Sequence, residues 1–301
     1  MNKDENPTPS AEGVSVVIPA YNEEAAIGDD LDAIKAAMDK NGSPYEIIVV
    51  DDASRDRTAE IAASRPWVRM VRHSRNKGGG ATRKRGIEEA KYDIIAIADA
   101  DGTYPVADIP ELVSHIGKYD LIIGARKLEA GTMKWLRAPA KWFLRKLAEF
   151  VTTFKIPDLN TGMRVFRRST IRRFYHLLPE RHSWVSTMTL AYLANNLDVK
   201  NVSINYFPRK GKSSFHPIKD GAFFFLLIFR TTMYFKPMKV LLPVSFLIFL
   251  LFLLKVFIIN TAGFTMPVDI REFDLMLFML AVVIGVAAFF ADMLAKFFRK
   301  F

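Results

Sequence analysis

Residues 92–101 read YDIIAIADAD, an apolar run that ends in two aspartates, and residues 45–52 repeat the pattern as YEIIVVDD. Short β-branched runs of this kind are typical of strands that are buried on both faces of a sheet. The sequence predicts strands at 14–20, 45–52, 67–73, 92–99 and 120–125, and helices at 24–40, 58–64, 80–90 and 107–118. This alternation indicates an α/β domain whose parallel sheet is covered by helices.

Acidic residues follow two of these strands. Asp51 and Asp52 close the second strand, and Asp99 and Asp101 follow the fourth. Ligands of parallel sheets bind beyond the carboxyl ends of the strands, so this edge is the expected nucleotide site. Two carboxylates at i and i+2 can bind one hard cation, Mg²⁺ or Mn²⁺, which would stabilise a departing diphosphate. Solvated turn acids are the alternative for the pair, and a loop cap is the alternative for Asp52.

Residues 76–80, NKGGG, form a glycine-rich turn before a predicted helix. Such a turn can let backbone amides approach a phosphate, although a plain flexible loop is the other interpretation. The chain has neither a GxxxxGK[ST] P-loop nor a GxGxxG motif after its first strand, which argues against NTPase and NAD-binding functions.

The last quarter of the chain has the composition of a membrane anchor. Residues 240–259 carry one charge, Lys255, and residues 275–291 carry none. We expect two transmembrane helices, at about 240–259 and 275–295, within a unit spanning 236–301. Cations flank the pair and the connecting segment is acidic, which predicts cytoplasmic ends, with Lys255 snorkelling to the headgroups. Two buried helices of a soluble domain are the alternative.

Composition narrows the remaining choices. The net charge is +10, there is no cysteine and the five histidines are scattered, which excludes disulfide scaffolds and thiolate sites and disfavours a multi-histidine metal centre. No basic module with interleaved aromatics is visible, so we expect no nucleic-acid partner. Residues 1–12 are polar and lack a signal-peptide core, which predicts a disordered tail before a cytoplasmic domain over 13–215.

Two more segments suit a membrane surface. Residues 133–155 combine apolar side chains at helical spacing with the cations Lys134, Arg137, Lys141 and Arg145, which predicts an interfacial amphipathic helix. Residues 216–235 contain an apolar stretch that is too short to span a membrane, which predicts a juxtamembrane interfacial helix. A domain helix with a solvated basic face and a core helix are the respective alternatives.

Five motifs occur in order: PAYNE at 19–23, DDASRDRT at 51–58, NKGGGATRKRG at 76–86, DAD at 99–101 and GAR at 124–126. Together they resemble the family 2 glycosyltransferases of the GT-A fold. With DLNTGMRVFRR at 158–168, RKGKSS at 209–214 and the two apolar runs, the chain is similar to the polyprenyl-phosphate glycosyltransferases. Dolichyl-phosphate mannose synthases and bacterial polyprenyl-phosphate glucosyltransferases belong to that group. The resemblance implies a Rossmann-like, mostly parallel GT-A domain followed by a two-helix transmembrane hairpin.

The resemblance also implies roles for individual residues. Asp99 and Asp101 would bind the metal, and Asp101 and Arg126 would be catalytic. The residues implied for the nucleotide sugar are Pro19, Tyr21, Glu23, Asp52, Lys84, Asp99 and Asp101, and those for the acceptor phosphate are Arg126, Arg137, Lys141 and Arg209. For Arg209, solvated charge is the alternative.

Three departures from the family pattern qualify these roles. Thr103 stands where the mannose synthases have Gln, which leaves a third protein ligand of the metal open. Lys141 stands where some members have Ser. Residues 183–189 lack a Glu that is frequent there and receive no role.

The expected reaction is an inverting, metal-dependent transfer of a hexose to polyprenyl phosphate, undecaprenyl or dolichyl, at the cytoplasmic face of the cell inner membrane. A phosphate acceptor is already anionic and needs no general base. UDP-glucose is the favoured donor, GDP-mannose the second, and a homo-oligomer is possible. A lipid hydroxyl or glycan acceptor, or a membrane-tethered nucleotide-sugar-binding protein without catalysis, are the alternatives.

Overall fold

The computed structural model describes residues 12–126, 158, 161–181, 183–209, 229, 232–234, 236–262 and 272–298. The chain divides into two compact units, Met1–Leu227 and Ile228–Phe301. The expected helix at 133–155 and nearly all of the expected tail at 1–12 lie outside the described residues. Of the expected helix at 216–235, only 229 and 232–234 are described, and these residues are helical.

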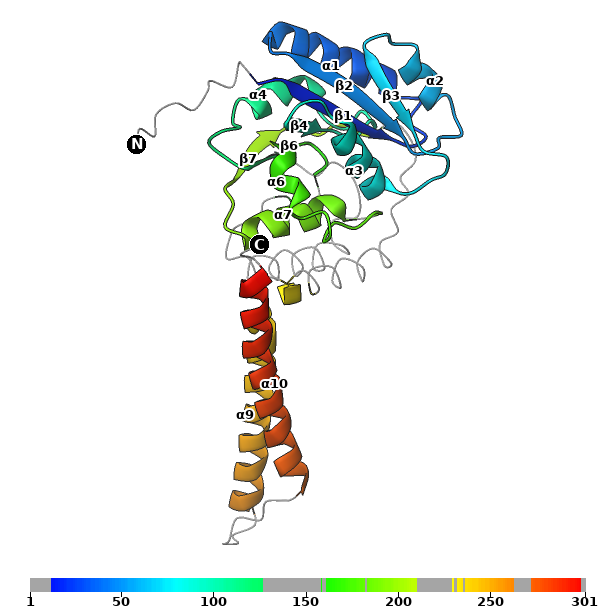
Figure 1. Ribbon diagram of the computed structural model, residues 1–301. Helices are drawn as coiled ribbons and strands as arrows, with labels where there is room; N and C mark the ends of the chain where they lie inside the picture. The colour runs from blue at the N-terminus through cyan, green and yellow to red at the C-terminus, as the bar shows by residue number, and fades with distance from the viewer. Residues whose placement is uncertain are drawn as a thin grey trace, which may run out of the picture. The chain divides into compact units, whose positions relative to one another are not determined.

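The first unit is built on a seven-stranded sheet (Figure 1) with the order β3-β2-β1-β4-β6-β5-β7. All neighbouring pairs are parallel except those made by β6, which is antiparallel to both β4 and β5. The α/β, mostly parallel fold predicted from the sequence is therefore confirmed. The strands are β1 (Val14–Ala20), β2 (Tyr45–Asp51), β3 (Val68–Arg72), β4 (Ile94–Ile97), β5 (Leu121–Arg126), β6 (Arg164–Arg167) and β7 (Val199–Ile204).

Helices cover both faces of the central strands. On one face, alternate residues of β1 such as Val16 and Ile18 join a core cluster with Leu31 and Ile34 of α1 (Ile27–Asn41). On the other face α3 (Gly79–Glu89) lies so close that a Cβ on Gly86 would meet Val17 at 2.3 Å. The remaining helices of this unit are α2 (Thr58–Ala63), η2 (Val106–Asp108), α4 (Ile109–Val113), α6 (Arg168–Arg172) and α7 (Trp184–Ala194).

The predicted helix at 107–118 is shorter in the structure. A 3-10 turn, η2, leads into α4, which ends at Val113. Gly117 follows with φ +99°, a left-handed conformation that favours glycine and turns the chain into β5. Strands β6 and β7 have no counterpart among the strands predicted from the sequence.

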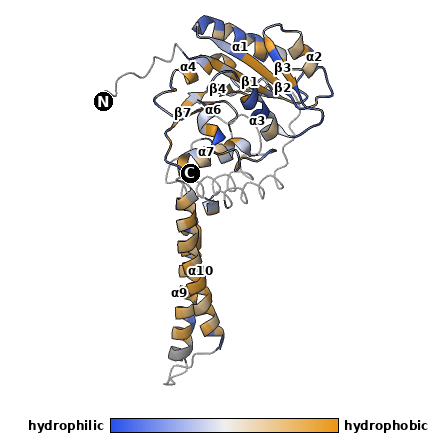
Figure 2. Ribbon diagram, in the orientation of Figure 1, coloured by the Kyte–Doolittle hydropathy of each residue, from blue (hydrophilic) through white to orange (hydrophobic). Residues whose placement is uncertain are grey.

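The second unit consists of two long apolar helices, α9 (Met238–Ala262) and α10 (Glu272–Phe298), which Figure 2 colours mostly as hydrophobic. Stretches of 21 and 26 residues within them are long and apolar enough to cross a membrane. Between the helices, the Ser245 hydroxyl donates to the Ala281 carbonyl at 2.7 Å. Lys255, expected to snorkel, instead pairs with the buried Asp274 of α10. An acid across the helix pair can satisfy the ammonium without moving it to the headgroups.

Candidate active site

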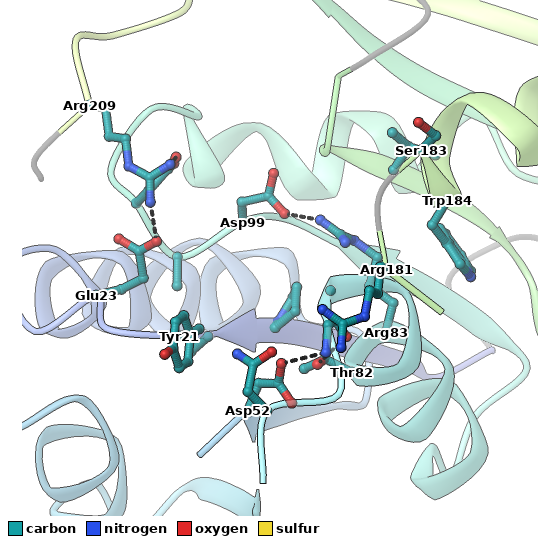
Figure 3. Close-up of a pocket in the computed structure, with 18 residues that line it drawn as sticks. Tyr21, Glu23, Asp52, Thr82, Arg83, Asp99, Arg181, Ser183, Trp184 and Arg209 are labelled. Atoms are coloured by element: carbon teal, nitrogen blue, oxygen red, sulfur yellow. Dashed lines mark hydrogen bonds and ion pairs between the residues drawn. The ribbon is translucent and has the colours of Figure 1, made fainter. Parts of the chain in front are cut away.

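A cavity of about 540 Å³ lies at the carboxyl ends of β1, β2 and β4. This is the edge at which parallel sheets bind ligands, because the loops that leave the strands converge there. Figure 3 shows Glu23 and Arg209 on one side of the cavity and Arg83 and Arg181 on the other. The lining residues are Pro19, Ala20, Tyr21, Glu23, Asp52, Asn76, Gly78, Gly79, Thr82, Arg83, Asp99, Ala100, Asp101, Arg181, Ser183, Trp184, Val185 and Arg209.

Asp52, directly after β2, has three hydrogen-bond partners in the protein. Its carboxylate accepts from the backbone amides of Lys77 and Gly78 at 2.8 Å each, and His73 Nδ1 lies 2.8 Å from Oδ1. Burial would raise the pKa of Asp52, but these partners together hold it below its usual range. Asp52 therefore fastens the glycine-rich turn to β2 while it lines the cavity.

Asp99 and Asp101 follow β4 and share the other end of the cavity. The Asp99 carboxylate pairs with the guanidinium of Arg83 on α3. Asp101 is 8% exposed and accepts from the Thr103 hydroxyl at 2.5 Å. Burial and the nearby Asp99 charge raise the pKa of Asp101. Thr103 thus orients the Asp101 carboxylate.

Glu23 and Arg209 complete the acidic end. Arg209 pairs with the Glu23 carboxylate, and its second guanidinium nitrogen lies 3.6 Å from Asp101 Oδ2. Burial is the main cause that raises the pKa of Glu23 to about 7; the pair with Arg209 opposes it, and Asp101 and Asp99 add to it. Three carboxylates and two arginines therefore surround this end of the cavity, so the acidic groups outnumber the basic groups by one.

The Asp99–Asp101 pair fits a divalent cation by its chemistry. Both side chains supply carboxylate oxygens to one cavity, and the Asp99 charge adds to burial in raising the pKa of Asp101, a repulsion that a cation would relieve. Gly162 makes this placement possible, because a Cβ there would meet Asp99 Oδ2 at 2.1 Å. Within the described residues no group of three or more His, Cys, Asp or Glu side chains has metal-binding spacing, so diphosphate and water oxygens would complete the shell.

The glycine-rich turn approaches backbone instead of open space. Gly80 N donates to the Arg181 carbonyl at 3.1 Å, and Ala81 N donates to the Glu180 carbonyl at 2.6 Å. A Cβ on Gly80 would lie 2.1 Å from the Pro179 carbonyl oxygen. The first amides of α3 are thereby occupied by the segment before α7, and the turn is neither a phosphate cradle in this structure nor a plain loop.

The structure brings most of the predicted nucleotide-sugar residues to the cavity but places two predicted residues elsewhere. Lys84 lies over the ring of Tyr175, 4.9 Å from its centroid, and does not line the cavity. Arg126 forms a bidentate pair with Asp158 at 2.6 and 2.9 Å and lies over Tyr206, also outside the lining. Arg137 and Lys141 lie outside the described residues. The predicted residues that line the cavity are Pro19, Tyr21, Glu23, Asp52, Asp99, Asp101 and Arg209.

Several lining residues were not identified from the sequence. Arg83 stands next to Lys84 in the same motif, and on a helix consecutive residues differ by about 100° in direction, so only one of the two faces the cavity. Ser183 has φ +66° and begins α7, where it and Trp184 form one wall. Arg181 precedes them, and no local motif marks any of the three.

Solved structures of known proteins share the fold. Glucosyl-3-phosphoglycerate synthase from Mycobacterium tuberculosis, in complex with Mn²⁺, UDP and phosphoglyceric acid, superposes with a TM-score of 0.60. The match covers 75% of this chain and 80% of that one at 19% identity. Mannosyl-3-phosphoglycerate synthase from Rubrobacter xylanophilus matches 74% of the chain with a TM-score of 0.55 at 17% identity. At such identities the likeness concerns the fold alone.

Relatives by sequence include proteins named for polyprenyl phosphates. The undecaprenyl-phosphate 4-deoxy-4-formamido-L-arabinose transferase of Edwardsiella ictaluri is 32% identical over 62% of this chain and 58% of its own length. A dolichyl-phosphate beta-glucosyltransferase of Trichomonas vaginalis is 29% identical over 66% of this chain and 65% of its own length. This chain thus spans between half and two thirds of these relatives. The profile of glycosyl transferase family 2 matches residues 15–174, more than half of the chain, and the chain belongs to that family.

Proposed function

We propose that the chain transfers a hexose from a nucleotide sugar to a polyprenyl phosphate. The observation that carries the proposal is the cavity in which Asp99 and Asp101 meet arginines at the carboxyl edge of a family 2 domain. Charged groups of both signs suit a diphosphate with its counter-ion and a second phosphate that approaches it. Two of the relatives are named as undecaprenyl-phosphate and dolichyl-phosphate sugar transferases, which supports this acceptor class.

The chemistry divides between positioning and charge stabilisation. An oxygen of the acceptor phosphate attacks the anomeric carbon, the bond to the nucleoside diphosphate breaks, and the configuration inverts. Asp99 and Asp101 would hold Mg²⁺ or Mn²⁺, which supplies positive charge to the departing diphosphate when it is bound. Thr103 keeps the Asp101 carboxylate oriented, and Arg83 keeps Asp99 in place. The acceptor is already ionised, so no side chain has to remove a proton.

The remaining residues receive roles according to the end of the cavity at which they lie. Pro19, Tyr21 and Asp52 would receive the nucleoside, since they line the cavity beyond β1 and β2. Arg209, which contacts Glu23 and Asp101 in this structure, would bind the acceptor phosphate. Arg126, which pairs with Asp158 outside the cavity lining, stays a proposed catalytic and acceptor-phosphate residue, and Arg137 and Lys141 stay proposed acceptor contacts. Lys84 stays a proposed residue of the donor side.

The donor we favour is UDP-glucose, with GDP-mannose second. A glucosyl donor agrees with the name of the Trichomonas relative, although the relatives together carry several sugars. The two apolar helices would anchor the enzyme in the cell inner membrane, with the catalytic unit in the cytoplasm beside its lipid substrate. A homo-oligomer stays part of the proposal, but Gly285 of α10 does not support it, because this glycine lies against Ser245 of α9 in the same chain.

The test is release of nucleoside diphosphate by the full chain in detergent, with Mn²⁺, a short polyprenyl phosphate and a panel of UDP- and GDP-sugars. We expect one sugar to turn over, and only when the lipid phosphate is present. Nucleotide binding without turnover across phosphate, hydroxyl and glycan acceptors would contradict the proposal and favour a binding protein.

A second candidate, transfer to a lipid hydroxyl or glycan, is favoured by one observation. A hydroxyl acceptor needs a general base, and Glu23, with a pKa of about 7, lines the cavity. Polyprenol and polyprenyl phosphate, compared as acceptors in the wild type and in Glu23→Gln, separate the two. Turnover of polyprenol that disappears in Glu23→Gln would establish the hydroxyl acceptor.

A further inference from the structure

The cavity holds three arginines, and they differ in what neutralises them. Arg83 pairs with Asp99, and Arg209 pairs with Glu23 and approaches Asp101. Within the described part of the chain, no carboxylate lies at ion-pair distance from the guanidinium of Arg181. Of the three arginines that line the cavity, Arg181 is therefore the one whose charge no described carboxylate neutralises.

The backbone of Arg181 is held by a hydrogen bond, whereas its side chain forms no hydrogen bond or ion pair with the described residues. Its carbonyl accepts from Gly80 N at 3.1 Å, which ties it to the start of α3. Gly78, at φ +98°, leaves room for it, because a Cβ there would meet Arg181 Cγ at 2.8 Å. The side chain of Arg181 therefore passes Gly78 and lines the cavity, where Figure 3 shows it, and the residue is exposed.

The same glycine indicates which ligand Arg181 meets. Gly78 N donates to Asp52 Oδ2 at 2.8 Å, so Arg181 stands beside the end of the cavity where the nucleoside is proposed to bind. Asp52 already has its two amide donors and His73, so its charge is stabilised without Arg181. Between that end and the Asp99–Asp101 pair lies the span that a diphosphate would occupy. Guanidinium groups recognise phosphates through parallel N–H···O bonds.

We propose that Arg181 binds the diphosphate of the nucleotide donor and so helps to position the donor. The proposal rests on the proposed function in that it takes the donor to be a nucleotide sugar. It assigns a role to the segment before α7, for which the motifs of the sequence provide none.

The experiment measures binding of uridine, UMP and UDP (guanosine, GMP and GDP if the panel selects a guanine donor) to the full chain in detergent, with Mg²⁺ present, by calorimetry. Arg181→Ala and Arg181→Gln are compared with the wild type. The matched control is Lys118→Ala, which removes one positive charge from an exposed residue before β5, at the opposite edge of the sheet. Thermal unfolding confirms that each variant is folded.

We expect both Arg181 variants to weaken UDP binding by about tenfold or more and to leave uridine binding within about twofold, while Lys118→Ala changes neither. The dependence of UDP affinity on salt should also fall. Equal weakening of uridine and UDP, or unchanged UDP affinity, would overturn the proposal. An unchanged UDP affinity with a raised KM for polyprenyl phosphate would overturn it too and assign Arg181 to the acceptor.

Binding and turnover separate this inference from the proposed function. Selective loss of UDP affinity in Arg181→Ala, without turnover on any polyprenyl phosphate, would support the inference and contradict the proposed acceptor. Turnover on polyprenyl phosphate with wild-type UDP affinity in Arg181→Ala would do the reverse.

Discussion

At one end of the cavity Asp52 receives two amide hydrogen bonds and the ring of His73, whereas at the other end Asp99 and Asp101 face side chains of arginine. Both ends bury carboxylates after a strand, but the resulting pKa shifts are opposite: that of Asp52 is lowered and that of Asp101 is raised. Backbone donors are set in place when the chain folds and cannot leave. Arginine side chains can move away when a ligand offers a better partner.

The difference separates folding from ligand binding. At the Asp52 end the protein donors are in place in the free protein, and these contacts contribute to the stability of the fold whether or not a nucleoside binds. At the Asp99–Asp101 end three carboxylates face two arginines, so this end gains most from a cation and a diphosphate. Substitutions at the two ends should therefore change different measurements.

The largest effect is expected for Asp101→Ala, which removes one of the two proposed metal ligands. Loss of a group that stabilises charge in the transition state lowers turnover by about a hundredfold to a thousandfold. Uridine binding and thermal stability should change little, because Asp52 and its partners are untouched. Release of nucleoside diphosphate checks this, with Asp39→Ala on the exposed end of α1 as the control. Full activity in Asp101→Ala would refute the metal assignment.

A smaller effect on the same end is expected for Gly162→Ala. The added methyl would stand 2.1 Å from Asp99 Oδ2, so the Asp99 carboxylate must shift from its place beside Gly162. We expect Mn²⁺ affinity in the presence of nucleotide, measured by electron paramagnetic resonance, to fall by about tenfold, the loss seen when a group that orients a metal ligand is changed. Gly28→Ala in α1 is the control, since the atom nearest to its added Cβ, at 3.1 Å, is the far end of the Arg65 side chain. An unchanged Mn²⁺ affinity in Gly162→Ala would show that Asp99 need not lie against this glycine.

At the other end, Asp52→Asn should destabilise the fold by about 1–3 kcal/mol, because Lys77 N and Gly78 N donate to different oxygens of Asp52 and the NH2 group of Asn would replace one of these oxygens. The carboxylate has a lowered pKa in the folded state, so its contribution to stability is present above the unfolded pKa of about 3.9. That contribution is lost as the pH falls through the folded pKa. Urea unfolding at several pH values should show the gap between wild type and Asp52→Asn closing below about pH 4. A gap that is constant from pH 7 to pH 3 would contradict the role of the charge.

The sequence predicted Asp52 but not the residues that donate to it. Apolar strands that end in aspartate can be identified locally, which is why Asp52, Asp99, Asp101 and the positions of the first five strands along the chain could be predicted. The donors to Asp52 come from residues 73–78, which depend on how the turn after β3 packs, and no motif carries that information.

Long-range partners explain the other differences. Arg126 carries a cation at a motif position, but its pair with Asp158 is set by the approach of a distant segment to β5. Lys255 has a composition that suggests snorkelling, whereas its pair with Asp274 depends on the register between α9 and α10. Charge and hydropathy along the chain predict which residues are exceptional but not which partner each one finds.

The smallest effect is expected for Arg209→Gln in the ligand-free protein. Its side chain is 33% exposed, and partly exposed ion pairs contribute about 0–1 kcal/mol because water competes for the charges. Urea unfolding without ligand should therefore give a smaller loss in the free energy of unfolding for Arg209→Gln than for Asp52→Asn. We expect this even though Arg209 contacts two carboxylates. A loss as large as that of Asp52→Asn would mean that the acidic end is also fixed on folding, and the contrast between the two ends would fail. A small loss would instead agree with the view that the side chains around Asp99 and Asp101 contribute little to the stability of the free protein and act mainly in ligand binding.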